Sequence, residues 1–121
     1  MAAFKSPLIV RKISANVWSL TGQLVYDSDI YGGTITVPKQ FITDFESIPK
    51  MFWWLFSPGN SNSVKPSVIH DYLCKMRMIR WLEAHKIFLE AMKVNDVSWI
   101  RRTALYQGVR WFGPRWEKDY A

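Results

Sequence analysis

The chain has 121 residues, a formal net charge of +6 and a single cysteine, Cys74. This length suits one domain with its own apolar core, and one cysteine excludes an internal disulfide framework. The longest apolar run, MFWWLF at residues 51–56, is far shorter than the roughly 20 residues of a transmembrane helix. We therefore expect one domain, residues 1–121, that is made in the cytoplasm and has no transmembrane segment.

The positive charge is concentrated in the second half of the chain. Residues 65–121 carry eleven Lys and Arg against six Asp and Glu, whereas residues 1–64 carry five against four. Such an excess is compatible with nucleic acid, anionic lipid or an acidic protein surface. A solvated basic face is the commoner explanation, so charge alone does not choose among these partners.

The first part of the chain has the pattern of β-strands. Four short segments are rich in β-branched and aromatic residues and are separated by turn-forming residues: 7–13, 16–20, 22–28 and 33–38. They predict an antiparallel β-meander of three to four strands within residues 1–38. Prolines and a polar run at residues 60–63 then predict an irregular connection, residues 39–65, with an exposed loop near its end.

From residue 66 the apolar residues recur with helical spacing. We expect a helix that starts at Pro66 or Ser67, a second over residues 80–94, and a third from Asp96 or Ser98 to Gly113. Residues 114–121 form a C-terminal tail. Strands followed by helices make the predicted fold class α+β. The expected apolar stripes are Ile69, Tyr72, Leu73 and Met76; Trp81, Ala84, Phe88, Ala91 and Met92; and Ile100, Leu105, Val109 and Phe112.

Two histidines interrupt these stripes at their margins. His70 and Cys74 lie nearly in line on the first helix, and His85 borders the stripe of the second. The connection between these helices is short, so they are predicted to be antiparallel neighbours whose histidines could face each other. Imidazoles at such a seam could bind metal, hold a proton near neutral pH, or hydrogen-bond a buried group, and the last is the commonest case.

Asp44 lies in a turn that runs from Thr43 to Pro49. Its carboxylate could accept backbone N–H groups of that turn, which is the usual role of Asp there. Alternatively, it could orient His70 or complete a cation site with Asp71, because a carboxylate commonly fixes the tautomer of a functional imidazole.

Three segments in order, VPKQFITDFESIP, VIHDYLC and EAHKIFLEAM, carry a family resemblance. Together with the helix that ends YQGVRWFG, they resemble the phage and prophage family catalogued as domain of unknown function 1353, over residues 36–113. Its pattern is a T-D-x-x-S-x-P turn, an H-D-x-x-Y helix and an A-D-x-x-F element. The matching residues are Thr43, Asp44, Ser47, Pro49, His70, Asp71 and Phe88.

Two positions depart from that pattern. Cys74 stands where the family usually has Tyr, and His85 stands where it usually has Asp. The resemblance implies that the second-helix Asp faces the first-helix His, so this chain would have two imidazoles there. The H-D-x-x-Y helix is also similar to the catalytic helix of secreted phospholipases A2, where the His activates water and the Asp binds calcium.

The leading hypothesis is a small noncatalytic protein of a tailed phage or prophage. It would be a virion component of the tail or neck, or an accessory protein in the host cytoplasm, and would bind a phage structural or host protein. The residues expected to make these contacts combine the aromatic and arginine side chains of protein-binding hot spots: Trp53, Trp54, Trp111, Arg115 and Trp116.

Two alternatives stay open. One is a metal-dependent hydrolase acting on the cell envelope, with His70, Asp71 and Asp44 as catalytic residues. A divalent metal would then be held by His70, His85 and Asp44. The other is nucleic-acid binding through the basic helical half, for which no helix-turn-helix, zinc-finger or RNA-recognition motif is present.

Overall fold

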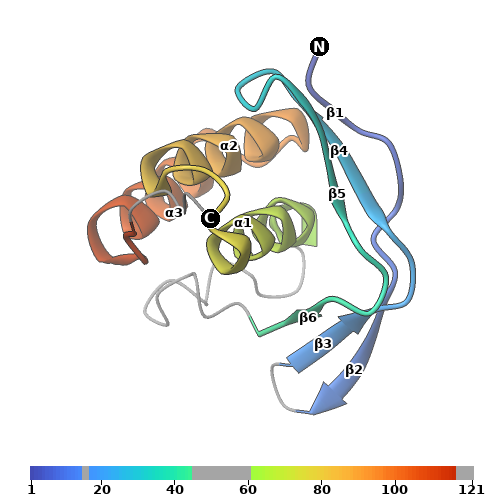
Figure 1. Cartoon of the computed structure of the whole chain (residues 1–121). Helices are drawn as coiled ribbons and strands as arrows, with labels where there is room; N and C mark the ends of the chain where they lie inside the picture. The colour runs from blue at the N-terminus through green and yellow to red at the C-terminus, as the bar shows by residue number, and fades with distance from the viewer. Residues whose placement is uncertain (15–16, 45–60, 117–121) are drawn as a thin grey trace.

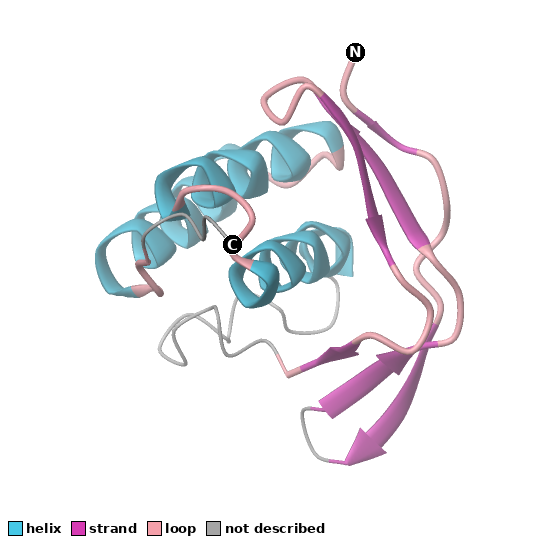
Figure 2. Cartoon of the chain, in the orientation of Figure 1, coloured by secondary structure: helices cyan, strands magenta, loops and turns pink. Residues whose placement is uncertain are grey.

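The computed structural model describes residues 1–14, 17–44 and 61–116 (Figure 1). The strands are β1 Ala3–Phe4, β2 Val10–Ser14, β3 Val17–Leu20, β4 Leu24–Ser28, β5 Gly33–Val37 and β6 Ile42–Thr43. The helices are α1 Val64–Met76, α2 Trp81–Val94 and α3 Trp99–Phe112. Antiparallel strands therefore precede three helices, and the predicted α+β class is confirmed. Figure 2 shows the helices on one side of the strands.

The strands form two antiparallel sheets, with the orders β1-β4-β5 and β2-β3-β6. The predicted meander is divided into two sheets, because the consecutive strands β3 and β4 do not pair with each other. The two-residue strands β1 and β6 occupy the edges that a continuous meander would have joined. Segments of that length carry no periodic signal, so the sequence pattern did not reveal them.

The β1-β4-β5 sheet supplies one wall of the core. Leu24, Tyr26 and Ser28 alternate with more exposed residues along β4, as expected for a strand with one buried face. Ile35 and Val37 of β5 are buried beside them. This sheet runs alongside the helices, whereas β2 and β3 extend away from them at one end (Figure 1). All five residues of β2 are accordingly exposed.

The helix boundaries follow local capping. The side chain of Ser98 accepts the N–H of Arg101 and begins α3, as predicted. Arg77 is the C-terminal cap of α1: it has a left-handed φ of 54° and donates its N–H to the carbonyl of Leu73. α1 begins two residues before Pro66, after a 3₁₀ turn at Ser61–Ser63. The prediction of an exposed loop at residues 60–63 is wrong for Ser63, which is completely buried.

The apolar stripes are confirmed on α2 and only partly on α1 and α3. Met76, Ile100 and Phe112 were expected in the core but are 45%, 74% and 64% exposed. α3 makes its main described contacts with α2 alone, so it buries only a narrow stripe, which includes Leu105 and Val109. In the described part of the chain, no helix has the length and apolar character to cross a bilayer.

Candidate functional site

His70 of α1 and His85 of α2 form a buried pair between the two helices. Nε2 of His70 lies 2.7 Å from Nδ1 of His85, and neither side chain reaches solvent. The connection between α1 and α2 is short enough to place the helices antiparallel, and the left-handed Arg77 turns the chain at its start. The prediction that the two histidines face each other is confirmed.

The His70 ring has contacts on two further sides. It stacks on Phe88, with the ring centroids 4.7 Å apart and the planes at 28°. The sulfur of Cys74, one helical turn onward, lies 3.5 Å from Nε2 of His70. Cys74 is itself buried, so its thiol forms part of the packing around the imidazole.

The C-terminal segment covers the other side of His85. The ring of Trp116 packs edge to face against the His85 ring, with the ring centroids 6.4 Å apart. The centroid of the Trp81 ring lies 5.5 Å from that of His85. Trp116 is only 7% exposed, and its indole N–H donates to the carbonyl of Ile79 at 2.8 Å. The guanidinium of Arg115 lies 4.8 Å from the Trp81 ring. Trp116 therefore covers His85 on this side and helps to shield it from solvent.

The residues predicted to bind a partner separate into three groups. Trp116 is buried, whereas Arg115 and Trp111 are exposed. Trp53 and Trp54 lie outside the described residues. The exposure of Trp111 and Arg115 leaves them available to a partner, whereas Trp116 packs against the core.

Burial keeps the two imidazoles neutral near pH 7. Burial first, and then His85, lower the pKa of His70 well below 6.5. Burial lowers the pKa of His85 to about 4; the Pro114 carbonyl opposes this shift, and Arg115 adds to it. Nε2 of His85 has no well-aligned hydrogen-bond partner among the described residues. Between two neutral rings, one of the two facing nitrogens carries the shared proton and the other accepts it, and the tautomers decide which.

Asp71 belongs to a second polar cluster, about 100° around α1 from His70. Its Oδ2 accepts the hydroxyl of Thr43 at 2.7 Å and lies 3.4 Å from the ammonium of Lys75. That ammonium is also 3.5 Å from Asp44 and donates to the carbonyl of Ile42 at 3.1 Å. Lys75 thus ties α1 to β6 and to Asp44, which follows β6.

Burial raises the pKa of Asp71, and the Thr43 hydroxyl and the Lys75 ammonium oppose that shift. Sequence reasoning assigned Lys75 only to the basic face. The signal that could have identified it is its position four residues after Asp71, where opposite charges meet on a helix.

The predicted catalytic and metal-binding residues are therefore divided between two clusters. His70 and His85 meet each other, and the described contacts connect Asp44 to Asp71 through Lys75 rather than to His70. Within residues 1–14, 17–44 and 61–116, no group of three or more His, Cys, Asp or Glu side chains could hold a metal ion. The role of His70, Asp71 and Asp44 in catalysis stays a prediction.

Comparison with known proteins gives a family but no activity. The model of the family described as "Protein of unknown function (DUF1353)" matches residues 18–109. The uncharacterized protein y4iH of Sinorhizobium fredii (strain NBRC 101917 / NGR234) is 30% identical over 89 residues, 73% of this chain and 37% of that protein. The uncharacterized protein y4jT of the same strain is 35% identical over 81 residues, which are 66% of this chain and 24% of that protein.

No solved structure matches the chain. The matched part of the chain covers only 37% of the length of y4iH and 24% of the length of y4jT. The family match includes both histidines of the buried pair, the Asp71 cluster and most of α3. The chain belongs to the DUF1353 family of proteins of unknown function.

Proposed function

We propose that this chain is a noncatalytic protein that acts by binding another protein, as a tail or neck component or an accessory protein of a tailed phage or prophage. The observation that carries the proposal is an exposed apolar surface on α3, the α3 aromatic face. It consists of Trp99, Ile100, Trp111 and Phe112, which are 67%, 74%, 62% and 64% exposed.

The geometry of α3 turns three of these four side chains outward, whereas Phe112 lies near the edge of the buried side at the end of the helix. At about 100° per residue, Trp99, Ile100 and Trp111 project away from the side that carries the buried Leu105 and Val109. Exposed apolar patches commonly mark a site of protein interaction, and each end of α3 carries an exposed apolar pair, Trp99 with Ile100 and Trp111 with Phe112. Large rings are also efficient contacts because they have few rotatable bonds to immobilise.

Trp111 is already held in place. Its indole N–H donates to the side chain of Gln107 at 3.0 Å, and the guanidinium of Arg110 lies 5.6 Å from its ring. A side chain that is ordered before binding loses less entropy when a partner covers it. This arrangement favours a binding role for Trp111 over incidental exposure.

The charge of α3 indicates the chemistry of the partner. The helix contains three arginines, Arg101, Arg102 and Arg110, and no acidic residue. Two copies joined through this face would bring like charges together, which disfavours self-association there. An acidic protein surface with apolar side chains complements the face best.

The burial of the polar site supports a noncatalytic role. His70, Asp71 and His85 are 0%, 1% and 0% exposed, and a catalytic group must touch its substrate. A hydrolase that used these residues would first have to separate α1 from α2 or from β6. The phage part of the proposal, and with it a location in the virion or the host cytoplasm, is an expectation drawn from the family resemblance of the sequence.

The proposal is tested by site-specific photo-crosslinking. A photoreactive amino acid at Thr103, one helical turn after Trp99 on the same side of α3, is compared in host cells with the same group at Lys39, which is exposed in the turn after β5. We expect a discrete protein adduct from position 103 that the Trp99→Ser/Trp111→Ser variant loses. Equal adducts from both positions, or an adduct with nucleic acid only, would contradict the proposal.

A further inference from the structure

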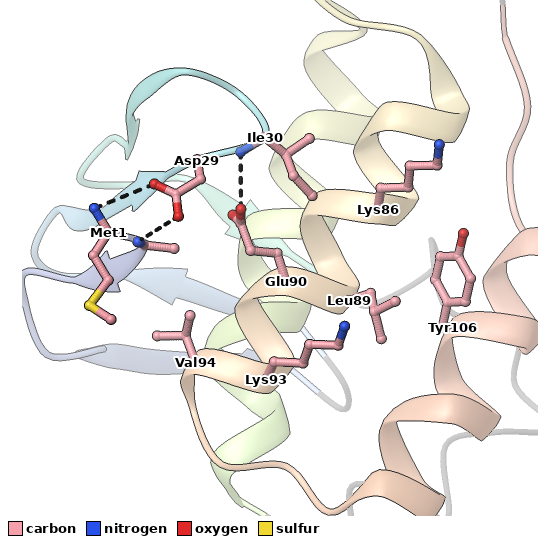
Figure 3. A pocket seen from close by; sticks show the side chains of 10 residues that line it. Met1, Asp29, Ile30, Lys86, Leu89, Glu90, Lys93, Val94 and Tyr106 are labelled. Carbon is pink, nitrogen blue, oxygen red and sulfur yellow. Dashed lines mark hydrogen bonds and ion pairs between the residues drawn. The ribbon is translucent and has the colours of Figure 1, made fainter.

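A groove with a volume of about 700 Å³ lies along α2 (Figure 3), and neither His70 nor His85 is among its lining residues. The N-terminal residues, the β4–β5 turn, α2 and one side chain of α3 form its walls. Its apolar surface comes from Met1, Ala2, Ile30, Leu89, Val94 and Tyr106. None of the residues that contact His70 or His85 lines it, so the groove is separate from the site described above.

Two lysines supply the unpaired charge of the groove. Lys86 and Lys93 are seven residues apart, which places them on one side of α2, and both are exposed. Among the described residues, neither ammonium forms an ion pair. Figure 3 shows both side chains beside Leu89, which lies between them along the helix.

The two carboxylates of the groove already have partners. Glu90 accepts the hydroxyls of Tyr26 and Ser28, both at 2.7 Å, and the backbone N–H of Ile30 at 3.0 Å. Asp29 lies 3.5 Å from the N-terminal ammonium of Met1 and accepts the N–H of Ala2 at 3.1 Å. These contacts hold both carboxylates against the protein, but only Asp29 has a cationic partner, so Glu90 keeps its negative charge and the two lysines outweigh it.

We propose that this groove binds a single-chain anionic amphiphile of the fatty-acid type. The hydrocarbon chain would lie on Leu89, Val94 and Tyr106, and the carboxylate would lie between Lys86 and Lys93. Apart from those two ammonium groups and the Tyr106 hydroxyl, the side-chain polar groups of the lining are already paired. The groove therefore offers an apolar body and a charged end for recognition, and little that would recognise a polar body. This inference is independent of the proposed protein contacts of α3.

The test is a titration with decanoate below its critical micelle concentration, followed by amide NMR of the full chain. Saturable shifts are expected at Ile30, Leu89 and Val94. The Lys86→Gln/Lys93→Gln variant is expected to bind roughly three- to tenfold more weakly, because two exposed ionic contacts are lost. The matched control Lys12→Gln/Lys39→Gln removes two exposed lysines outside the groove and should leave affinity unchanged.

Butyrate separates amphiphile binding from simple anion binding, since it has the same carboxylate and a much shorter chain. Much weaker binding of butyrate is expected, because most of the apolar contact is absent. The proposal is overturned by butyrate binding as well as decanoate, by shifts centred elsewhere, or by equal affinity in Lys86→Gln/Lys93→Gln. Absence of saturable decanoate binding overturns it too, even if anionic vesicles bind.

Discussion

Nε2 of His70 and Nδ1 of His85 are 2.7 Å apart in the completely buried seam between α1 and α2. The pair depends on neutrality, because two charged imidazoles at that separation would repel each other without solvent to screen them. The sequence resemblance implies Asp at the position of His85, and on that expectation an imidazole–imidazole contact would stand here in place of an imidazole–carboxylate contact. We interpret the seam as a structural element that holds the two helices together.

Acid is expected to destabilise the fold through this pair. The unfolded histidines bind protons near pH 6.5, whereas the folded pKa is about 4 for His85 and well below 6.5 for His70. Their contribution to stability is therefore complete above pH 6.5 and is lost as the pH falls toward 4. With two protons involved, the free energy of unfolding should fall by up to about 2.7 kcal/mol per pH unit within this window.

Urea denaturation at a series of pH values measures this slope. Asp71 acts in the opposite sense, because its raised folded pKa adds stability that is lost as the pH rises above 3.8, and it offsets part of the histidine effect at the acid end. A His85→Gln variant should show a shallower slope. A flat profile between pH 6.5 and 5 in the unmodified chain would contradict the buried neutral pair.

The His85→Asp variant places a carboxylate at the seam, as the sequence resemblance implies for this position. A carboxylate beside His70 favours the charged imidazole, so the pKa of His70 should rise above its value in the unmodified chain. NMR titration of the His70 ring measures the change. A His70 pKa that stays as low as before would mean that the new carboxylate does not contact the ring.

Removing the ammonium of Lys75 should destabilise the fold. The Lys75→Met variant leaves the buried carboxylate of Asp71 with the Thr43 hydroxyl as its remaining described partner. Lys75 is 38% exposed, so the cost is well below that of a fully buried pair, about 1 to 2 kcal/mol. Thermal unfolding of Lys75→Met is compared with that of the control variant Lys39→Met. The control should change stability by less than about 0.5 kcal/mol. Equal stability of the two variants would show that Lys75 contributes nothing at this position.

The two tryptophans of the C-terminal region should behave differently. Trp116→Ala removes a ring that is 7% exposed and covers His85, and should cost about 3 kcal/mol. Trp111→Ala removes a ring that is 62% exposed and should cost less than about 1 kcal/mol. Chemical denaturation of both variants tests the assignment of Trp116 to the core and of Trp111 to the surface, and similar costs would overturn it.

Periodicity predicted the helices and the meeting of His70 with His85, because helix spacing and a short connection determine which faces approach. It overestimated the apolar contact of α3, where Ile100 and Phe112 are exposed because the helix needs only a narrow buried stripe. The Lys75 contacts were missed, since they depend on where β6 passes α1, which local sequence does not encode. For the same reason, sequence alone linked Asp44 to His70, whereas its described contact is with Lys75.

The most direct test of the account is the yield of the Thr103 photo-adduct in two variants of the chain. His85→Gln should lower the melting temperature and keep the adduct under conditions where the variant is folded, because the seam is structural. Trp99→Ser/Trp111→Ser should keep the melting temperature and lose the adduct. Loss of the adduct in folded His85→Gln, together with full retention in Trp99→Ser/Trp111→Ser, would contradict the account and make the buried seam the functional site.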